Sequence, residues 1–321
     1  MTHGIGLIGL GIMGRRMIGR LNQHAGFRIT ALWDPSPDAV AAARREAPGA
    51  TVAPDAAAVA RRADTACLYI ASPPASHPAL SHLGFDHGKA VFCEKPLTHD
   101  DAAGAALAER ARRERRPSAV NFSFASSPSF QRIEALARNG ELGPIERITI
   151  EASFARWPRD WQPAGRWLSE RVEGGFTREV ISHFVFATQR ITGPLTVESA
   201  RPSYPAGGVA AETALHARLT GNGIAVEIDA AVRGTVGDTN LWTVVGSKGA
   251  IRMRDWYALE RRDGADWAPA IEGDVEALRA AAGLRQLDQL AALLEGRSHT
   301  LASFDEALAV QRTIERMLAG A

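Results

Sequence analysis

Three glycines and an aspartate near the start of the chain have the types and spacing of a dinucleotide site. The apolar run 5–8 leads into Gly9-Leu10-Gly11-Ile12-Met13-Gly14, and a second apolar run ends at Asp34, 20 residues after Gly14. Gly9 would make a tight turn, Gly11 would admit a pyrophosphate and Gly14 would let helix and strand pack closely. The residues expected to contact the dinucleotide here are Gly9, Gly11, Ile12, Met13, Gly14 and Asp34.

The aspartate also bears on which dinucleotide is preferred. The Asp34 carboxylate can accept hydrogen bonds from both ribose hydroxyls, and its charge repels a 2′-phosphate, so the sequence favours NAD over NADP. Ser36 and the nearby Arg44 and Arg45 keep NADP as the alternative.

In the first 122 residues or so, the sequence predicts strands and helices that alternate along the chain. Apolar runs predict strands at 5–8, 27–33, 64–71, 90–93 and 118–123, and intervening helices are expected at 37–46, at 55–62, from about Ser76 and after a cap at Thr98. Such alternation predicts a parallel, doubly wound Rossmann sheet with helices on both faces. Ligands of these sheets bind at the carboxyl ends of the strands, where Gly9–Gly14, Asp34 and the segments 72–74 and 94–96 fall.

The pattern changes after a helix expected at 129–138. Residues 148–154 alternate strictly between apolar and polar, and the runs 213–219 and 225–232 flank Gly221-Asn222-Gly223, a hairpin signal. Strands at 241–245 and 250–253 and helices at about 275–295 and 305–319 should follow. The fold class is therefore α/β, with a dinucleotide-binding domain at 1–122 and a substrate-binding and oligomerisation domain at 123–321 built on an open, mostly antiparallel sheet.

The composition limits which kinds of molecule the protein is expected to bind. Lys plus Arg number 37 and Asp plus Glu 36, so no net charge attracts the chain to nucleic acid or an anionic membrane. No apolar stretch reaches the roughly 18 residues of a membrane span. Small molecules and copies of the chain itself are the expected partners, since an open sheet favours a homo-oligomer, a dimer or tetramer. Cys67 and Cys93 should be buried reduced thiols, no metal is expected, and the protein should be cytoplasmic.

Together with the glycine turn, Glu94-Lys95-Pro96 and the segment 174–183 resemble the glucose–fructose oxidoreductase, inositol dehydrogenase and rhizopine-catabolism family, Gfo/Idh/MocA. The resemblance spans the whole chain and implies an NAD(P)-dependent oxidoreductase that acts on a carbinol or carbonyl of a sugar, polyol or related molecule. It also implies that Glu94 and Lys95 border the cofactor. The strand-four loop of the family, which borders the cofactor too, matches Ser72, Pro73, Pro74 and His77.

The resemblance also implies which side chains act on the substrate oxygen. The family's lysine meets the reacting oxygen, which gives that role to Lys95, and its acidic residue and histidine fall on Glu179 and His183. A histidine with a pKa near 6.5 can exchange the proton, and Glu179, four residues earlier on the same helix face, would orient it or pair with Lys95. The family usually has aspartate where Glu179 stands and glycine where Ile181 stands. The geometry that supports the catalytic residues should therefore differ in this chain.

Each candidate also has a structural alternative. Lys95 could form a surface ion pair, His183 could be a core histidine between Phe184 and Phe186, and Glu179 could be solvated or paired with Arg178. His77 is expected to border the cofactor rather than catalyse. The residues proposed to contact substrate, or else to pack a domain interface, are Trp157, Trp161, Arg166 and Arg178, with Trp167, Arg156 and Arg159 as neighbours of the same kind.

Three other functions stay open alongside hydride transfer at a carbinol. One is reduction of an imine or enamine on the same scaffold. Another is glycoside cleavage through transient oxidation by NAD, and the last is a dinucleotide-binding regulator without turnover. Intact Lys95 and His183 weigh against the regulator, because a sensor needs no proton relay.

Overall fold

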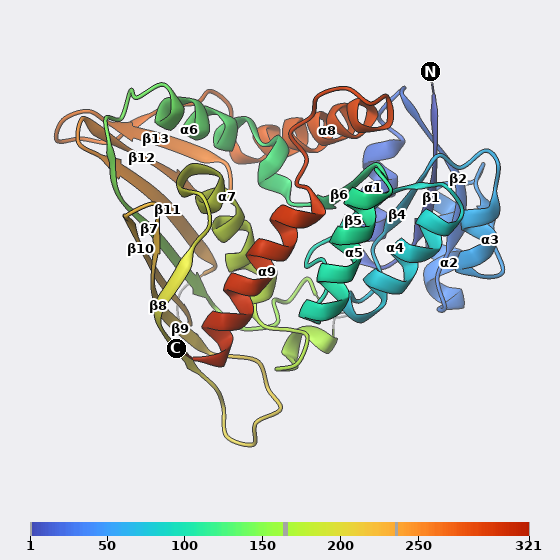
Figure 1. Cartoon of the computed structure of the whole chain (residues 1–321), viewed down its shortest axis with the longest axis horizontal. Coiled ribbons are helices and arrows are strands. Elements are labelled where there is room, and N and C mark those ends of the chain that lie inside the picture. Colours follow the sequence, from blue (N-terminus) through green and yellow to red (C-terminus); the bar gives the residue numbers. More distant parts are fainter. Residues whose placement is uncertain (1, 163–165, 235–236, 321) are drawn as a thin grey trace. The chain divides into compact units, whose positions relative to one another are not determined.

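The computed structural model describes residues 2–162, 166–234 and 237–320. Two compact units divide the chain (Figure 1). Unit 1 comprises Met1–Phe122 and Gly283–Leu308, and unit 2 comprises Ser123–Ala282 and Ala309–Ala321. Unit 1 ends at Phe122 in its first stretch, and Gly283–Leu308 also belong to it by their packing. The roles given to the domains 1–122 and 123–321 remain predictions.

Unit 1 is a parallel six-stranded sheet with strand order β3-β2-β1-β4-β5-β6, as the alternating pattern predicts. Its strands are β1 His3–Ile8, β2 Phe27–Trp33, β3 Thr51–Val52, β4 Cys67–Ile70, β5 Ala90–Glu94 and β6 Ser118–Asn121. Its helices include α1 Ile12–Leu21, α2 Pro37–Glu46, α3 Ala56–Arg61, α4 His77–Asp86 and α5 Asp101–Arg113. Part of α8, Val275–Leu294, and the start of α9, Phe304–Ala319, complete it.

Alternate residues of these strands face opposite layers of helices. Leu7, Tyr69 and Phe92 belong to a buried cluster that includes side chains of α1, α2 and α8. On the other face, Leu68 and Val91 lie close to Gly84 of α4, where a Cβ would stand 2.8 Å from Val91. Both faces of the sheet are therefore covered, which is why its strands read as continuous apolar runs rather than as alternating ones.

Two details differ from the expectation. Thr98 does not cap a helix, because α5 begins after Asp100, whose carboxylate accepts a hydrogen bond from the Ala103 amide at 3.0 Å. Thr98 instead accepts from the Asp100 amide at 3.2 Å. Threonine and aspartate are both good caps, so local sequence could not choose between them. The two-residue strand β3 was not expected either.

Unit 2 contains an eight-stranded sheet with order β14-β13-β12-β11-β7-β10-β9-β8. Only β7 and β10 are parallel among its described pairs, so the expectation of a mostly antiparallel sheet is correct. The strands are β7 Ile145–Phe154, β8 Thr196–Ser203, β9 Ala214–Gly221, β10 Ile224–Val232, β11 Thr239–Gly246, β12 Gly249–Arg254, β13 Ala258–Arg262 and β14 Ala268–Pro269.

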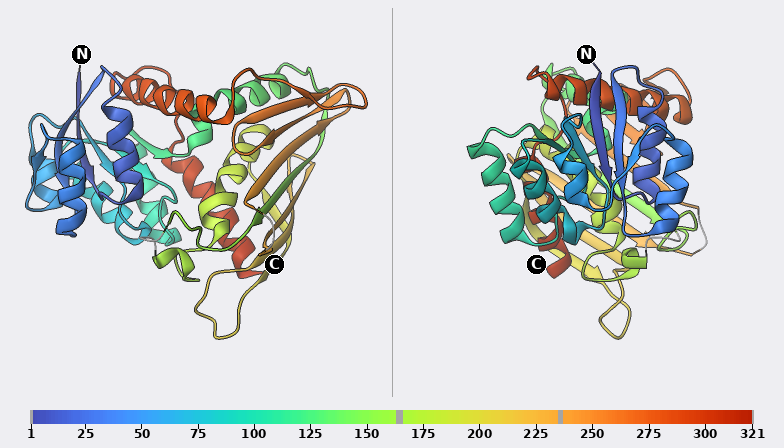
Figure 2. Two further views of the ribbon diagram at one scale, coloured as in Figure 1. Left: turned by 180° about the vertical axis from the view of Figure 1, so that it is seen from behind. Right: turned by 90° about the vertical axis from the view of Figure 1, so that its right-hand side faces the viewer.

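One face of this sheet carries the helices of unit 2. Ile148, Ile150 and Ala152 of β7 are buried, and Glu151 between them is exposed, as the alternation predicts. Figure 2 shows α6, Pro128–Arg138, and α7, Ser182–Thr192, on the same side of the sheet. The indole of Trp242 on β11 donates to Thr188 of α7 at 3.1 Å, which fixes α7 against the sheet.

Two tight turns of unit 2 use positive φ angles. The expected hairpin at Asn222-Gly223 joins β9 to β10 with φ of +49° and +80°, as an Asn-Gly turn of type I′ requires. The turn after β12 was not expected, because its central residues are Asp255 and Trp256, with φ of +52° and +73°. A left-handed conformation costs an ordinary L-residue roughly 1–2 kcal/mol, so local sequence does not favour the bulky Trp256 in this turn.

Candidate functional site

The glycine turn has the geometry that its spacing predicts. Gly9 has a φ of +90°, and a Cβ there would stand 2.5 Å from the Ser72 amide nitrogen. A Cβ on Gly14 would overlap the Gly9 carbonyl oxygen, so both positions require glycine. Gly11, the N-terminal neighbour of α1, faces open space within 4 Å. The free helix terminus, with no acidic residue in its first turn, suits a bound anion.

Asp34 closes on the glycine turn from the end of β2. One carboxylate oxygen accepts from the Leu10 amide at 2.7 Å, and the other accepts from the Ser36 amide at 2.8 Å. The Gly9 amide also donates to the Trp33 carbonyl at 3.0 Å. Each carboxylate oxygen keeps a second lone pair, so Asp34 can fix the loop and still accept from a ribose hydroxyl.

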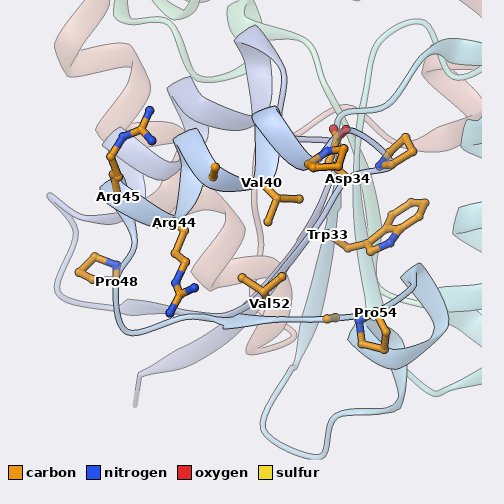
Figure 3. Close-up of a pocket in the computed structure, with 12 residues that line it drawn as sticks. Trp33, Asp34, Val40, Arg44, Arg45, Pro48, Val52 and Pro54 are labelled. Atoms are coloured by element: carbon orange, nitrogen blue, oxygen red, sulfur yellow. The ribbon is translucent and has the colours of Figure 1, made fainter.

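A pocket of about 670 Å³ extends from Asp34 (Figure 3). It runs between α2 and the segment around β3, and its residues are Trp33, Asp34, Pro35, Pro37, Val40, Ala41, Arg44, Arg45, Pro48, Val52, Ala53 and Pro54. Apolar side chains dominate it, and the Arg44 guanidinium lies near Val52 in the close-up. The pocket therefore combines apolar walls with a cation and, at one end, the predicted ribose-binding carboxylate.

His77 joins two loops at the carboxyl edge of the sheet. Its Nε2 lies 2.8 Å from the Ser72 carbonyl oxygen and its Nδ1 lies 2.8 Å from the Pro96 carbonyl oxygen. Burial lowers the pKa of His77, and the charge of Lys95 acts in the same direction. A neutral imidazole has one N–H, so it donates to one of these carbonyls at a time. His77 thus lies between Ser72 and the segment after Lys95, and its place beside the cofactor stays a prediction.

Glu94, the last residue of β5, sits in a buried hydrogen-bond network that the sequence did not reveal. Its carboxylate accepts from the Tyr69 hydroxyl and from the Asn121 amide, the latter at 2.6 Å. Gln286 of α8 donates to Asn121 at 2.5 Å, and Arg20 of α1 donates to Gln286 at 3.2 Å. All of these are elements of unit 1. Glu94 is held directly from β4 and β6, and α8 supports Asn121 through Gln286. Lys95, buried with 9% of its surface exposed, follows directly.

In unit 2, the predicted Gly174-Gly175 pair lets the chain pass a buried carboxylate. Glu212 is 1% exposed and accepts from the Thr177 amide at 2.7 Å. Gly175 has a φ of +99°, and a Cβ there would overlap the Glu212 carboxylate. Burial raises the pKa of Glu212. The glycines are thus needed where the helical segment bearing Glu179 begins.

Glu179 and His183 do not share one regular α-helix, which corrects the expectation of a common helix face. Thr177–Ile181 form a π-helix, and α7 begins at Ser182. A π turn takes one residue more than an α turn, so residues four apart across this junction are not aligned as in an α-helix. π turns occur often at functional sites. Ile181, where the family usually has glycine, is completely buried. Whether Glu179 orients His183 or pairs with Lys95 stays a prediction.

Arg178 is committed to contacts within unit 2. It donates to both carboxylate oxygens of Glu315 at 2.6 and 2.7 Å. It also donates to the carbonyl oxygens of Gly174 at 2.7 Å and Arg171 at 2.9 Å. These bonds occupy the guanidinium and clamp the start of the π-helix, so they favour a structural role over the predicted substrate contact.

His183 lies in an aromatic cluster, defined here by Phe124, His183, Phe184 and Trp256. The imidazole is 7% exposed, and its ring centre lies 5.8 Å from that of Phe124 and 5.3 Å from that of Trp256. Both contacts are edge-to-face. Phe184 was foreseen as a neighbour of His183 in the chain, whereas Phe124 and Trp256 were not.

The tryptophans predicted to contact substrate differ in their surroundings. Trp157 packs against Phe154 and Phe176, and its indole donates to the Leu168 carbonyl at 2.8 Å. Trp161 is 44% exposed and lies 4.8 Å from the Arg159 guanidinium. Arg166 begins the short 3-10 helix Arg166–Ser169, and its side chain lies outside the described part of the chain. Trp161 is therefore the better placed of the two for a ligand.

The described residues contain no group of three or more His, Cys, Asp or Glu side chains that could hold a metal ion. Within the same part of the chain, no helix is both long and apolar enough to cross a membrane. Cys67 and Cys93 are buried free thiols, and burial raises the pKa of Cys67 to about 12.

Comparison with known families covers both units. Residues 3–122 match the oxidoreductase family with an NAD-binding Rossmann fold, and residues 130–252 match the GFO/IDH/MocA C-terminal domain. Among individual proteins, the inositol 2-dehydrogenase of Corynebacterium glutamicum is 32% identical over 146 residues, which are 44% of this chain and 42% of that protein. The inositol 2-dehydrogenase of Gluconacetobacter diazotrophicus is 33% identical over 148 residues, 45% of this chain and 44% of that protein. The chain thus matches less than half the length of these relatives.

Solved structures resemble the chain over nearly its whole length. A myo-inositol dehydrogenase from Corynebacterium glutamicum has a TM-score of 0.80 at 19% identity and covers 99% of this chain and 96% of its own. An oxidoreductase from Agrobacterium radiobacter, in complex with NAD⁺, L-tartaric acid and magnesium, has a TM-score of 0.85 at 18% identity and covers 98% and 95%. At these identities the likeness shows the fold.

Proposed function

Because the chain belongs to the GFO/IDH/MocA oxidoreductase family, with its NAD-binding Rossmann fold, we propose that it is an NAD-dependent dehydrogenase of a sugar, polyol or related hydroxyl compound. The observation that carries the proposal is the closure of Asp34 on the Leu10 amide at 2.7 Å, beside the open space over Gly11. This geometry offers a carboxylate to a ribose and a helix terminus to a pyrophosphate. Two relatives are named inositol 2-dehydrogenase, which makes cyclic polyols the first substrates to test.

The residues present fit such a cofactor in unit 1. Gly9, Gly11 and Gly14 leave the backbone accessible to phosphates, and the pocket beside Asp34 has apolar walls suited to the adenosine end. NAD, when bound, accepts the hydride. The negative charge of Asp34 favours NAD, and Arg44 in the pocket wall keeps NADP as the alternative.

The proposed chemistry divides between two groups. As the hydride leaves the carbinol carbon, the Lys95 ammonium stabilises charge on the substrate oxygen. His183 accepts the hydroxyl proton and returns it in the reverse reaction. The network around Glu94 holds the strand end from which Lys95 projects, and the Gly174-Gly175 turn positions the segment leading to His183.

The decisive experiment measures NADH formation with myo-inositol and a panel of polyols and sugars, for the wild type and Lys95→Ala. The variant should lose about 10²- to 10⁴-fold in turnover while NADH affinity barely changes. An alanine variant with wild-type turnover would refute the role of Lys95. Dissociation constants for NADH and NADPH test the cofactor, and NADPH binding tenfold tighter, about 1.4 kcal/mol, would refute the role of Asp34.

We also propose that the chain forms a homo-oligomer through the open face of the eight-stranded sheet. Among the described strands, the exposed residues Glu151, Arg218 and Glu227 lie on that face, and Arg218 and Glu227 lie 3.7 Å apart across β9 and β10. A polar face of this kind would pair through charges. Light scattering tests the assembly, and a monomer at micromolar concentration would refute it. The free thiols Cys67 and Cys93 support a reducing location such as the cytoplasm.

A further inference from the structure

A tryptophan in a backbone conformation that bulky residues rarely adopt lies against His183. Trp256 has a φ of +73° and follows Asp255, whose φ is +52°, in the turn between β12 and β13 (Figure 1). The Tyr257 amide donates to the Arg254 carbonyl at 3.2 Å across this turn. Residues held in such conformations concentrate at functional sites, because surrounding contacts must enforce them.

Asn240 on β11 enforces the turn. Its side-chain oxygen accepts from the Trp256 amide at 2.9 Å, and its backbone carbonyl accepts from the Asp255 amide at 3.1 Å. From the other side, the Ser129 hydroxyl donates to the Tyr257 carbonyl at 2.5 Å. Both central amides of the turn are therefore held by one buried asparagine, and the indole leaves the sheet in a fixed direction.

That direction brings the indole to the predicted proton-transfer group. The ring centres of Trp256 and His183 lie 5.3 Å apart at an interplanar angle of 80°. Trp256 also lies 5.6 Å from Phe124 and 5.6 Å from Phe184. The half-buried indole thus forms one wall of the aromatic cluster, and its edge-to-face contact restricts how the imidazole can rotate.

We propose that Trp256 is a positioning residue for His183. The left-handed turn templated by Asn240 holds the indole where it sets the plane of the imidazole and so aims the nitrogen that exchanges the proton. The rate of proton transfer depends steeply on the position of this nitrogen, because a misplacement of about 1 Å can cost 10²-fold in rate. The catalytic consequence rests on the function proposed for His183, whereas the orientation of the ring does not.

A matched pair of glycine variants separates the indole from the strained backbone. Trp256→Gly and Asp255→Gly each place glycine at one left-handed position of the same turn, but only Trp256→Gly removes the indole. The readout is the imidazole resonance of His183 in full-length, histidine-labelled protein with NADH, identified among the nine histidines by its absence in His183→Asn. It should move in Trp256→Gly, move less in Trp256→Phe and stay at the wild-type position in Asp255→Gly. An unmoved resonance in Trp256→Gly, or equal movement in both glycine variants, would overturn the proposal.

Kinetics with myo-inositol, or with the panel polyol that is turned over fastest, test the catalytic consequence. Trp256→Gly should lose roughly 10- to 100-fold in kcat with KM little changed, and Asp255→Gly should keep the wild-type rate. Wild-type kcat in Trp256→Gly would overturn a positioning role in catalysis. If His183→Asn itself retains full turnover, the function proposed for His183 is wrong, and the resonance measurement alone then decides whether Trp256 orients the ring.

Discussion

The amide of Asn121, at the end of β6, donates a 2.6 Å hydrogen bond to the carboxylate of Glu94, at the end of β5. The same carboxylate accepts from Tyr69, which is 1% exposed on β4. Burial and the charge of Glu94 raise the pKa of Tyr69 well above its usual value, so the phenol stays protonated and serves as a donor. Three adjacent strands are thereby tied together directly before Lys95.

Removing the phenol should weaken this tie measurably. Tyr69→Phe keeps the ring that packs 5.6 Å from Phe92 but removes a donor to a charged acceptor, which should cost about 1.5–3 kcal/mol. Tyr204→Phe is the control, because it also removes a phenol's hydrogen bond, from Tyr204 to the Leu318 carbonyl at 2.8 Å, but in unit 2, which does not contain β5. Amide hydrogen exchange should show reduced protection of β5 in Tyr69→Phe alone. Equal protection in both variants would contradict the prediction.

Gly175→Ala should impair the segment that bears Glu179 and His183. The new Cβ would both adopt a φ of +99° and overlap the Glu212 carboxylate. Gly207→Ala isolates the first effect, because Gly207 has a φ of +97° and no atom within 4 Å of a built Cβ. Gly207→Ala should lose about 1–2 kcal/mol of stability, and Gly175→Ala should lose more. Thermal unfolding compares them, and similar melting temperatures would show that the Glu212 contact does not constrain the turn.

Glu212 should make stability depend on pH. Burial raises its folded pKa above the unfolded value, so the folded state binds the proton more tightly. The stabilising contribution is therefore full below the unfolded pKa and is lost as pH rises through the folded pKa. Glu212→Gln stays neutral and keeps an acceptor for the Thr177 amide, so it should match wild type at low pH and be more stable above the folded pKa. Melting temperatures across pH test this. The exposed Glu198→Gln should show no such divergence, and parallel wild-type and Glu212→Gln curves would contradict the prediction.

Local signals predicted the parts of the fold that depend on neighbouring residues. The glycine turn, the strand ending at Asp34 and the Asn222-Gly223 hairpin all follow from short segments with specific backbone requirements. The hydrogen-bond networks of the buried carboxylates Glu94 and Glu212 could not be predicted from short segments, because their partners are remote in sequence. Gln286 reaches Asn121 across 165 positions, and Glu212 caps a segment 35 positions away.

The site was predicted in part for the same reason. Gly9, Asp34 and Lys95 stand at strand ends that apolar runs reveal, whereas the surroundings of His183 come from a β-turn. A tryptophan at φ of +73° contradicts local preference, and the hydrogen bond from its amide to Asn240 on another strand supports it. The π-helix likewise explains why the spacing of Glu179 and His183 wrongly predicted a shared helix face. A four-residue interval implies a common face only in a regular α-helix.

Arg178 has two possible roles, a structural ion pair with Glu315 and the substrate contact expected from the sequence. Its guanidinium forms a bidentate pair with Glu315, and the side chains are 8% and 33% exposed. Breaking a fully buried pair costs about 3–5 kcal/mol, and the partial exposure of Glu315 should reduce this to about 2–3 kcal/mol. Arg178→Met and Glu315→Gln should therefore both lower the melting temperature by several degrees. The two changes should add less than fully, because both remove the same ion pair. A substrate-binding arginine would instead raise KM in Arg178→Met, with Glu315→Gln unaffected. Measuring stability and KM for both single variants and the double variant separates the roles. A raised KM at unchanged stability in Arg178→Met would restore the substrate contact expected from the sequence.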